Sequence, residues 1–223
     1  MNILLGVTGS VAAIKLPQLF DGLSPMGEVK VVATTSAIKI IKRTKHYHLG
    51  NLGFWELDED GLLGRKVCDI LSEEDEWKWE SIGDPVLHID LKDWADVLVV
   101  APLGANTLAK MANGLCDNLL TCIYRAWLMN KPIVVAPAMN TDMWEHPVTH
   151  EHLGVLHTRH DRSRPMTQNN PRIDAQNFAI VNPAKKQLAC GTTGVGAMAD
   201  IKDIVEAVKV LYDKTEEEKE IKT

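Results

Sequence analysis

Short apolar runs recur along the chain, and small or polar residues follow each of them. Runs of about 4–8 apolar residues bounded by turn-forming residues are typical of buried strands. On this pattern we expect buried strands at residues 3–8, 29–33, 97–101 and 133–136. Helical periodicity follows over 11–15 and 108–128. Strands that alternate with helices predict a single-domain, three-layer α/β/α Rossmann-like (flavodoxin-like) fold with a parallel sheet.

Three stretches depart from this alternation. Residues 41–75 combine a basic run with Gly-rich and acidic stretches, and residues 146–176 are rich in histidine and arginine. We expect both to be long excursions from the core, because long loops are usually functional or mobile. Residues 214–223 are strongly charged and predict a solvated helix end or a disordered tail. Pro17 should kink the first helix or mark its early end.

Composition narrows the range of functions. The chain has 223 residues, 45% of them hydrophobic, a formal net charge of -6 and a pI of about 5.7. An acidic chain argues against a nucleic-acid surface, because counterion release needs clustered lysine and arginine. Its apolar runs fall short of the about 20 residues that span a membrane. The start enters a strand pattern without a basic leader region, so we expect a cytoplasmic protein.

The four cysteines do not form a metal-binding pattern. Cys68, Cys116, Cys122 and Cys190 have no C-x-x-C spacing, and no histidine cluster completes a zinc site. In a reducing compartment we expect them to be thiols. Cys116 and Cys122 lie in a helical pattern and are interpreted as core residues. Cys190 lies just before a glycine-rich turn, where a thiol can be accessible.

Polar residues after three of the expected strands are candidates for ligand binding. The carboxyl ends of parallel strands form the edge where α/β sheets bind ligands. Gly9 and Ser10 open a helix after the first strand, and helix N-termini bind phosphate. Residues 34–36 and 104–107 follow the second and third. Ordinary helix capping explains the first two groups equally well. The G-x-G-x-x-G fingerprint is missing, which argues against a dinucleotide.

Three segments carry more specific information. Residues 84–90 read Asp-Pro-Val-Leu-His-Ile-Asp, 137–144 read Pro-Ala-Met-Asn-Thr-Asp-Met-Trp, and 189–198 read Ala-Cys-Gly-Thr-Thr-Gly-Val-Gly-Ala-Met. Taken alone, His88 would be an exposed or core-edge histidine, and Asn140 a strand-end amide able to grip a carboxylate. Together with residues 106–121, the three segments resemble the flavin-containing cysteine decarboxylases.

The resemblance implies a set of site residues. It covers most of residues 1–40 and 75–212, so we expect a flavoprotein domain over 1–212 and a charged tail over 213–223. The positions expected to bind flavin mononucleotide (FMN) are Gly9, Ser10, Val11, Thr34, Thr35, Ser36, Gly104, Ala105, Asn106, Thr107 and Ala138. The positions expected to bind substrate are Asn140, Gln187, Ala189 and Met198, and the catalytic ones are His88 and Cys190.

The resemblance also implies a reaction. The substrate would be 4'-phosphopantothenoylcysteine, which FMN oxidises to a thioaldehyde before carbon dioxide leaves. His88 would act as the base, since histidine titrates near neutral pH. Asn140 would bind the substrate carboxylate, and Cys190 would return a proton, giving 4'-phosphopantetheine for coenzyme A biosynthesis. We expect a homotrimer with active sites between subunits, and neither nucleic acid nor membrane as partner.

Three features differ from the family pattern, and one of them is that residues 41–70 look expanded. Thr192 replaces an acidic residue that is usual in the glycine-rich turn. The segment between Trp144 and Cys190 looks longer than usual and contains several cationic candidates. These side chains could bind the substrate phosphate or form a solvated loop: His157, Arg159, His160, Arg162, Arg164 and Arg172.

Three other functions occur among proteins with this resemblance. Halotolerance-type relatives bind and inhibit a protein phosphatase, usually with long acidic extensions, whereas this tail is short. Other relatives decarboxylate a peptide with a C-terminal cysteine or transfer a prenyl group to flavin. Phosphatase binding should survive mutation of Cys190, and decarboxylation should not.

Overall fold

A six-stranded parallel sheet forms the centre of the computed structural model, which describes residues 1–43, 47–50, 53–57, 63–160, 177–187, 191 and 193–221. The strand order is β6-β2-β1-β7-β8-β9, and every neighbouring pair is parallel. The strands are β1 (Asn2–Val7), β2 (Glu28–Ala33), β6 (Ile70–Leu71), β7 (Val97–Leu103), β8 (Ile133–Pro137) and β9 (Phe178–Ile180). All four strands expected from the sequence are present, and β6 and β9 extend the sheet at its edges.

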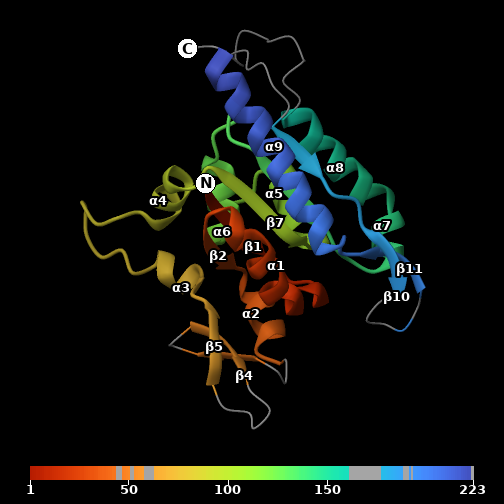
Figure 1. Ribbon diagram of the computed structural model, residues 1–223, viewed down its shortest axis with the longest axis horizontal. Helices are drawn as coiled ribbons and strands as arrows, with labels where there is room; N and C mark the ends of the chain where they lie inside the picture. The colour runs from red at the N-terminus through yellow and green to blue at the C-terminus, as the bar shows by residue number, and fades with distance from the viewer. Residues whose placement is uncertain are drawn as a thin grey trace.

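Both faces of the sheet are buried, which explains the continuous apolar runs. Alternate residues of β7 point to opposite sides: Val97 and Val99 belong to one core, and Leu98 and Val100 to the other. The first core is covered by the 3₁₀ turn η1 (Val11–Lys15), α1 (Leu16–Leu23), α2 (Thr35–Ile41) and α9 (Ile201–Ile221). The second is covered by α4 (Leu87–Trp94), α5 (Ala105–Asn113), α6 (Leu119–Ala126) and α8 (Pro147–His160). Figure 1 shows the helical layers on either side of the sheet, which confirms the predicted α/β/α architecture.

The first helical stretch divides at its proline. The 3₁₀ turn η1 ends at Lys15, and α1 begins at Leu16 with Pro17 in its first turn. A proline there costs no hydrogen bond, because the first N–H groups of a helix have no intrahelical partner. Pro17 therefore marks a helix boundary, as expected. A second 3₁₀ turn, η2 (Ser24–Met26), leads into β2.

Residues 108–128 are not one helix, contrary to the periodicity. Gly114 adopts the left-handed conformation at φ 74° and ends α5, and the side chain of Asn118 then caps α6. Cys116 lies in the connection and is exposed, so its interpretation as a core residue is wrong. Cys122 lies in α6 and is partly buried.

Region 41–75 contains regular structure rather than an extended loop. Strands β3 (Tyr47–Gly50), β4 (Gly53–Leu57) and β5 (Leu63–Cys68) form an antiparallel sheet, followed by β6 and α3 (Glu73–Glu76). Phe54 and Val67 of this sheet are buried in the first core. Arg65 forms a bidentate ion pair with Asp21 of α1, at 2.7 and 2.9 Å. Apolar packing and this ion pair hold the small sheet against α1.

Part of region 146–176 is also helical. Helix α8 spans Pro147–His160 and buries Leu153 and Leu156 in the second core. His160 is 3% exposed, and its ring stacks on Phe178. Residues 161–176 lie outside the described part of the chain. Among the described residues, no helix is both long and apolar enough to cross a membrane.

The last elements lie at one flank of the sheet. A short helix, α7 (Thr141–Glu145), follows β8, and β10 (Ala184–Gln187) pairs with β11 (Thr193–Ala197) as an antiparallel hairpin. The charged C-terminal stretch continues α9 as far as Ile221, so the helix-end alternative for this stretch is confirmed over these residues.

Candidate functional site

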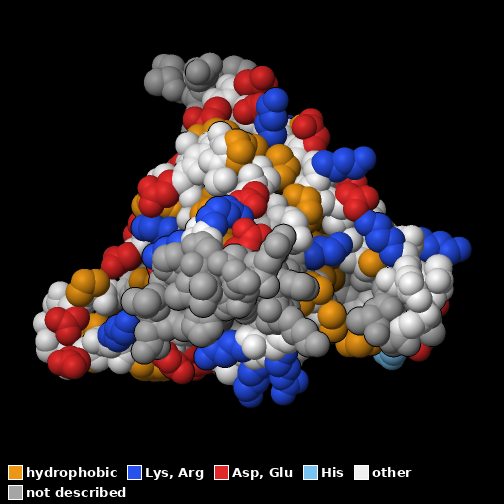
Figure 2. Space-filling model, turned by 60° about the horizontal axis from the view of Figure 1, so that its bottom comes forward, with side chains coloured by type: hydrophobic (Ala, Val, Ile, Leu, Met, Phe, Trp, Pro, Cys, Tyr) orange, Lys and Arg blue, Asp and Glu red, His pale blue; other side chains and the backbone are white. Residues whose placement is uncertain are grey.

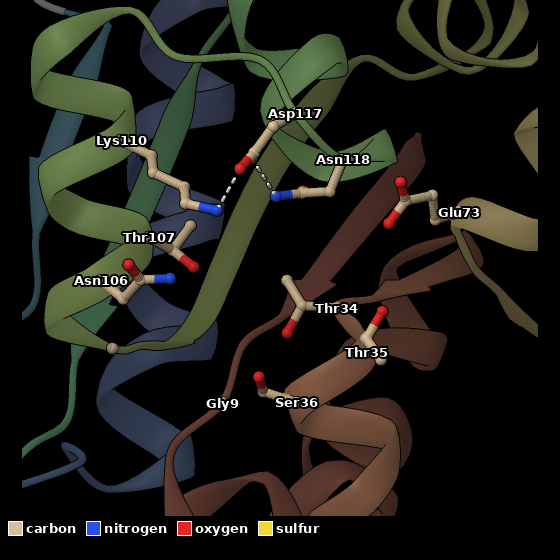
Figure 3. A pocket seen from close by; sticks show the side chains of 11 residues that line it. Gly9, Thr34, Thr35, Ser36, Glu73, Asn106, Thr107, Lys110, Asp117 and Asn118 are labelled. Carbon is tan, nitrogen blue, oxygen red and sulfur yellow. Dashed lines mark hydrogen bonds and ion pairs between the residues drawn. The ribbon is translucent and has the colours of Figure 1, made fainter.

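A cavity of about 220 Å³ opens at the carboxyl ends of β1, β2 and β7. Figure 3 shows that polar side chains from α2 and α5 face it from opposite sides. The residues that line it are Gly9, Thr34, Thr35, Ser36, Glu73, Gly104, Asn106, Thr107, Lys110, Asp117 and Asn118. The cavity therefore lies where a parallel α/β sheet is expected to bind a ligand.

Buried hydrogen bonds hold together the strand ends beneath this cavity. Thr8 is fully buried, and its hydroxyl donates to the carbonyl of Pro102 at 2.7 Å. The same hydroxyl accepts from the backbone N–H of Gly104, also at 2.7 Å. One side chain therefore fixes the end of β1 against the start of α5. Nothing in the sequence around Thr8 predicts this role, because its two partners lie 94 and 96 positions further along the chain.

The α2 side of the cavity combines capping with close packing. Thr34 accepts a hydrogen bond from Ala37 N–H at 3.3 Å and so caps α2. A Cβ at Gly9 would lie 2.5 Å from Cβ of Ser36, so only glycine fits between this turn and α2. The sequence left helix capping and ligand binding open as alternatives for residues 34–36. In the structure, this segment both caps α2 and lines the cavity.

The α5–α6 side contributes a charged pair. Lys110 contacts Asp117 at 2.5 Å, and Asp117 also accepts from the Asn118 amide at 3.0 Å (Figure 3). The hydrogen bond from Lys110 lowers the pKa of the Asp117 carboxyl. With Glu73 of α3, these residues complete the lining beyond the predicted set. None of these four residues follows the end of an expected strand. Lys110, Asp117 and Asn118 lie within residues 106–121, which is the only indication of them in the sequence.

The remaining flavin candidates lie beside the cavity rather than in its lining. Ser10 accepts from Ala12 N–H and caps η1, and Val11 is exposed in the same turn. Ala105 begins α5. Ala138 is buried, and its N–H donates to the carbonyl of Leu103 at 3.0 Å. Each is adjacent in sequence to a strand end or to a lining residue.

His88 lies in the first turn of α4. Its Nδ1 is 2.5 Å from Oε1 of Glu76, and its backbone N–H donates to Oε2 of the same carboxylate at 3.0 Å. The His88 side chain is 26% exposed and that of Glu76 is 15% exposed. Helix α3 therefore presents Glu73 to the cavity and Glu76 to His88. Glu76 was not predicted, since nothing in the sequence links it to His88.

Asn140 lies at the opposite flank, where the hairpin docks. Its side chain accepts from Asp142 N–H at 2.8 Å and caps α7. The N–H of Met139 donates to the carbonyl of Gly196 in β11 at 2.9 Å. A Cβ at Gly194 would overlap the Thr141 hydroxyl, so β11 packs directly on α7. The structure therefore joins the 137–144 segment to the β10–β11 hairpin.

The other substrate candidates lie on or beside this hairpin. Gln187 is exposed at the end of β10, and Met198, just after β11, is buried in the first core. Ala189 and Cys190 lie outside the described residues, between β10 and β11. Figure 1 shows α4, with His88, on one side of the molecule and α7 with the hairpin on the other. A single chain therefore brings Asn140 near the hairpin but does not bring His88 to it.

Of the cationic candidates after Trp144, the structure describes His157, Arg159 and His160, all near the end of α8. Arg159 donates to the carbonyl of Met111 at 3.3 Å, and His160 is buried beside Tyr124. Burial lowers the pKa of His160 to about 4, so it is neutral at neutral pH. A buried, neutral His160 in α8 neither binds phosphate as a cation nor belongs to a solvated loop, so both alternatives predicted for it are wrong. Arg162, Arg164 and Arg172 lie outside the described residues.

Comparison with known proteins identifies relatives over nearly the whole chain. The Flavoprotein family model matches residues 1–212. The probable phosphopantothenoylcysteine decarboxylase of Arabidopsis thaliana is 43% identical over 213 residues, which are 95% of this chain and 89% of the relative.

Solved structures agree with the match to the Flavoprotein family. A cysteine-to-serine mutant of PPC decarboxylase complexed with pantothenoylaminoethenethiol has a TM-score of 0.73 and 42% identity, covering 95% of this chain and 98% of that chain. The FMN binding protein AtHal3 has a TM-score of 0.71 and 42% identity, over 96% and 97%. The fold and the family resemblance predicted from the sequence are confirmed. This chain belongs to the Flavoprotein family, with phosphopantothenoylcysteine decarboxylases among its relatives.

Proposed function

We propose that this protein is an FMN-dependent carboxy-lyase that converts 4'-phosphopantothenoylcysteine to 4'-phosphopantetheine, a step of coenzyme A biosynthesis. The observation that carries the proposal is the cavity at the carboxyl ends of β1, β2 and β7. Seven of the residues assigned to FMN from the sequence line it: Gly9, Thr34, Thr35, Ser36, Gly104, Asn106 and Thr107.

The donor set of the cavity suits FMN. Hydroxyl groups come from α2 and α5, and the first turn of α5 offers backbone N–H groups, which bind phosphate favourably. Asn106 adds an amide with both donor and acceptor character. The cationic lining residue Lys110 is paired with Asp117. Thr34, Ser36, Asn106 and Thr107 would therefore hold the phosphate and the ribityl hydroxyls mainly through neutral groups.

FMN held by the cavity residues would supply the reversible two-electron chemistry that the decarboxylation of the cysteinyl part of the substrate needs. His88 would accept a proton from the substrate thiol as general base. Asn140, fixed by its hydrogen bond to Asp142, would orient the substrate carboxylate. Cys190 would donate the proton that completes the product. The similar PPC decarboxylase structure, a cysteine-to-serine mutant complexed with pantothenoylaminoethenethiol, supports a role for a cysteine in such a reaction.

We infer that the active site forms between subunits of a homotrimer. His88 and the Asn140–hairpin unit lie at separate flanks of one chain, so a second copy would have to supply one of them (Figure 1). The segment between α3 and α4, which leads to His88, carries apolar side chains in solvent. Trp77 is 75% exposed and Ile82 97% exposed. Burial of these side chains in a subunit interface would contribute on the order of 25 cal/mol per Å² of apolar surface.

The surface charge argues against nucleic acid as a partner. Figure 2 shows acidic and basic side chains interspersed over one face, and the net charge of the chain is -6. Nucleic-acid binding needs a concentrated basic surface. We therefore propose that nucleic acid is not a partner, and we also propose, from the sequence expectations, a cytoplasmic enzyme that does not bind membranes.

The decisive test combines absorbance and product analysis. The purified protein should show a flavin spectrum and should convert 4'-phosphopantothenoylcysteine to a product lighter by the mass of carbon dioxide. His88→Asn should retain flavin and lose turnover. A flavin spectrum without any mass change would overturn the decarboxylase proposal and favour another substrate or a regulatory role.

A complementation experiment tests the shared site. His88→Asn and Asn140→Ala should each be inactive as homo-oligomers. Mixed oligomers should recover activity, because some interfaces would then contain both native residues. Light scattering should give the mass of three chains. A monomer, or mixed oligomers without activity, would overturn the inference.

A further inference from the structure

Glu76 of α3 holds both the backbone and the ring of His88. The residue that precedes α4 is Val86, whose side chain cannot cap the helix. Glu76 supplies the cap, since its Oε2 accepts the His88 backbone N–H at 3.0 Å. Its Oε1 lies 2.5 Å from the His88 Nδ1. One carboxylate therefore fixes the start of α4 and the orientation of the imidazole.

This contact is sheltered from solvent. The side chain of Glu76 is 15% exposed, and that of His88 is 26% exposed. A hydrogen bond to a charged group is stronger where water is partly excluded. Neighbouring acidic residues on α3 do not share the contact: Glu74 points into solvent, and Asp75 caps α3 through the N–H of Ser72. The arrangement is specific to Glu76.

An ionised carboxylate can only accept hydrogen bonds. Nδ1 of His88 must therefore carry the proton that it shares with Glu76, and the lone pair of the neutral ring lies on Nε2. We propose that Glu76 is a positioning residue that selects the Nδ1–H tautomer of His88 and presents Nε2 as the base. This proposal rests on the proposed function for its catalytic meaning.

The proton balance of the step is simple. The S–H bond of the substrate breaks, its electron pair stays on sulfur, and an N–H bond forms at Nε2. The ring then carries a positive charge, which Glu76 stabilises across the Nδ1–H bond. A carboxylate partner plays this orienting and stabilising part for histidine bases in general.

Glu76→Gln separates helix capping from tautomer selection. The amide oxygen of glutamine can still accept the His88 backbone N–H, so the cap can survive. The amide nitrogen would then face Nδ1 and donate to it, which favours the opposite tautomer with the proton on Nε2. Glu74→Gln is the matched control, because it removes the same charge from an exposed position of the same helix.

Nitrogen-15 NMR of histidine-labelled protein gives the tautomer directly. We expect the Nδ1–H form of His88 in the wild type and in Glu74→Gln, and the Nε2–H form in Glu76→Gln. Turnover should fall by at least about 10- to 100-fold in Glu76→Gln, the range for residues that orient a metal-binding histidine, and by up to about 10⁴-fold, the loss when a catalytic histidine is left in the wrong tautomer. KM and flavin content should stay at the control values, because substrate and flavin contacts are unchanged.

The readouts distinguish the possible failures. An Nε2–H tautomer in the wild type, or an unchanged kcat in Glu76→Gln, would overturn the proposal. If Glu76→Gln unfolds, Glu76→Asp keeps the charge and should retain the Nδ1–H tautomer; the Nε2–H form there would also overturn it. Absence of wild-type turnover would refute the proposed function, while the NMR result would still decide the role of Glu76.

Discussion

Replacement of Thr8 by valine tests whether the bonds beneath the cavity organise the site. Valine has nearly the shape of threonine but lacks the hydroxyl, which donates to the Pro102 carbonyl and accepts from Gly104 N–H. The Pro102 carbonyl would keep a second donor, the backbone N–H of Thr8, at 3.2 Å. The N–H of Gly104 would lose the hydroxyl that it meets in the described structure. The loss of folding free energy in Thr8→Val therefore comes mainly from the unpaired N–H of Gly104.

The size of the effect follows from these bonds. A buried donor left without a partner costs about 1–3 kcal/mol, and the lost hydrogen bond itself contributes about 1 kcal/mol. Burial of a methyl group in place of the hydroxyl offsets part of this. We expect Thr8→Val to lower the free energy of unfolding by about 2–3 kcal/mol. Gly104 lines the cavity together with Asn106 and Thr107, so a shift of its backbone would displace these groups. Flavin affinity should therefore fall about 10-fold, equivalent to about 1.4 kcal/mol.

Urea unfolding of the flavin-free protein measures the first quantity without a contribution from flavin binding, and a flavin fluorescence titration measures the second. Thr8→Ser is the matched control, because serine keeps the hydroxyl and removes only a methyl group. Thr8→Val should be weaker than Thr8→Ser in both assays. Equal stability and equal flavin affinity of the two variants would refute the role assigned to these hydrogen bonds.

Other contacts lead to three further predictions. Because burial holds the pKa of His160 at about 4, below its ordinary 6.5, the folded protein should lose up to about 3 kcal/mol as pH falls from about 6.5 to 4. Urea midpoints across this range should flatten in His160→Phe, and an unchanged slope would contradict the assignment. Gly194→Ala should lower turnover but not flavin content, because the new methyl group collides with Thr141. The double variant Gly194→Ala/Thr141→Ala should regain activity in product assays, and failure to do so would count against docking of the hairpin on α7. Lys131→Met removes the ammonium group that donates to three carbonyls at the end of α4, two of them at 2.7 Å, and should lower stability by about 1–2 kcal/mol; an unchanged urea midpoint would exclude the capping role.

The central sheet was predictable because its strands are buried on both faces. Strands β1, β7 and β8 lie between two helical layers, so nearly every residue is apolar and the run is visible without periodicity. The edge strands β6 and β9 are only two and three residues long, too short to produce such a run. Helix α8 was missed for a related reason. It buries few apolar side chains, among them Leu153 and Leu156, and also buries His160, so its sequence lacks an apolar stripe.

The cavity was predictable only on the side formed by strand ends. Residues 34–36 and 104–107 follow strands directly, and topology alone brings them together. Lys110, Asp117 and Glu73 reach the cavity from helices or from the connection between helices. Their position depends on how helices pack over the sheet edge, which the local pattern does not specify. Glu76 is a stronger case, since its contact with His88 spans twelve residues without regular periodicity.

The glycine-rich signature after Cys190 acquires a structural meaning. From the sequence, its glycines indicated an accessible turn for a reactive thiol. In the structure, Gly194 and Gly196 allow β11 to lie directly on residues 139–141, and Gly196 also adopts a φ of 141° that disfavours other residues. Two of the three family signatures are therefore one packed unit, in which the backbone that carries Asn140 is bonded to the hairpin that leads to Cys190. The third signature is fixed separately by Glu76. The site proposed above contains all three signatures, so it has to join two separately fixed units, which is why the proposal includes association of subunits.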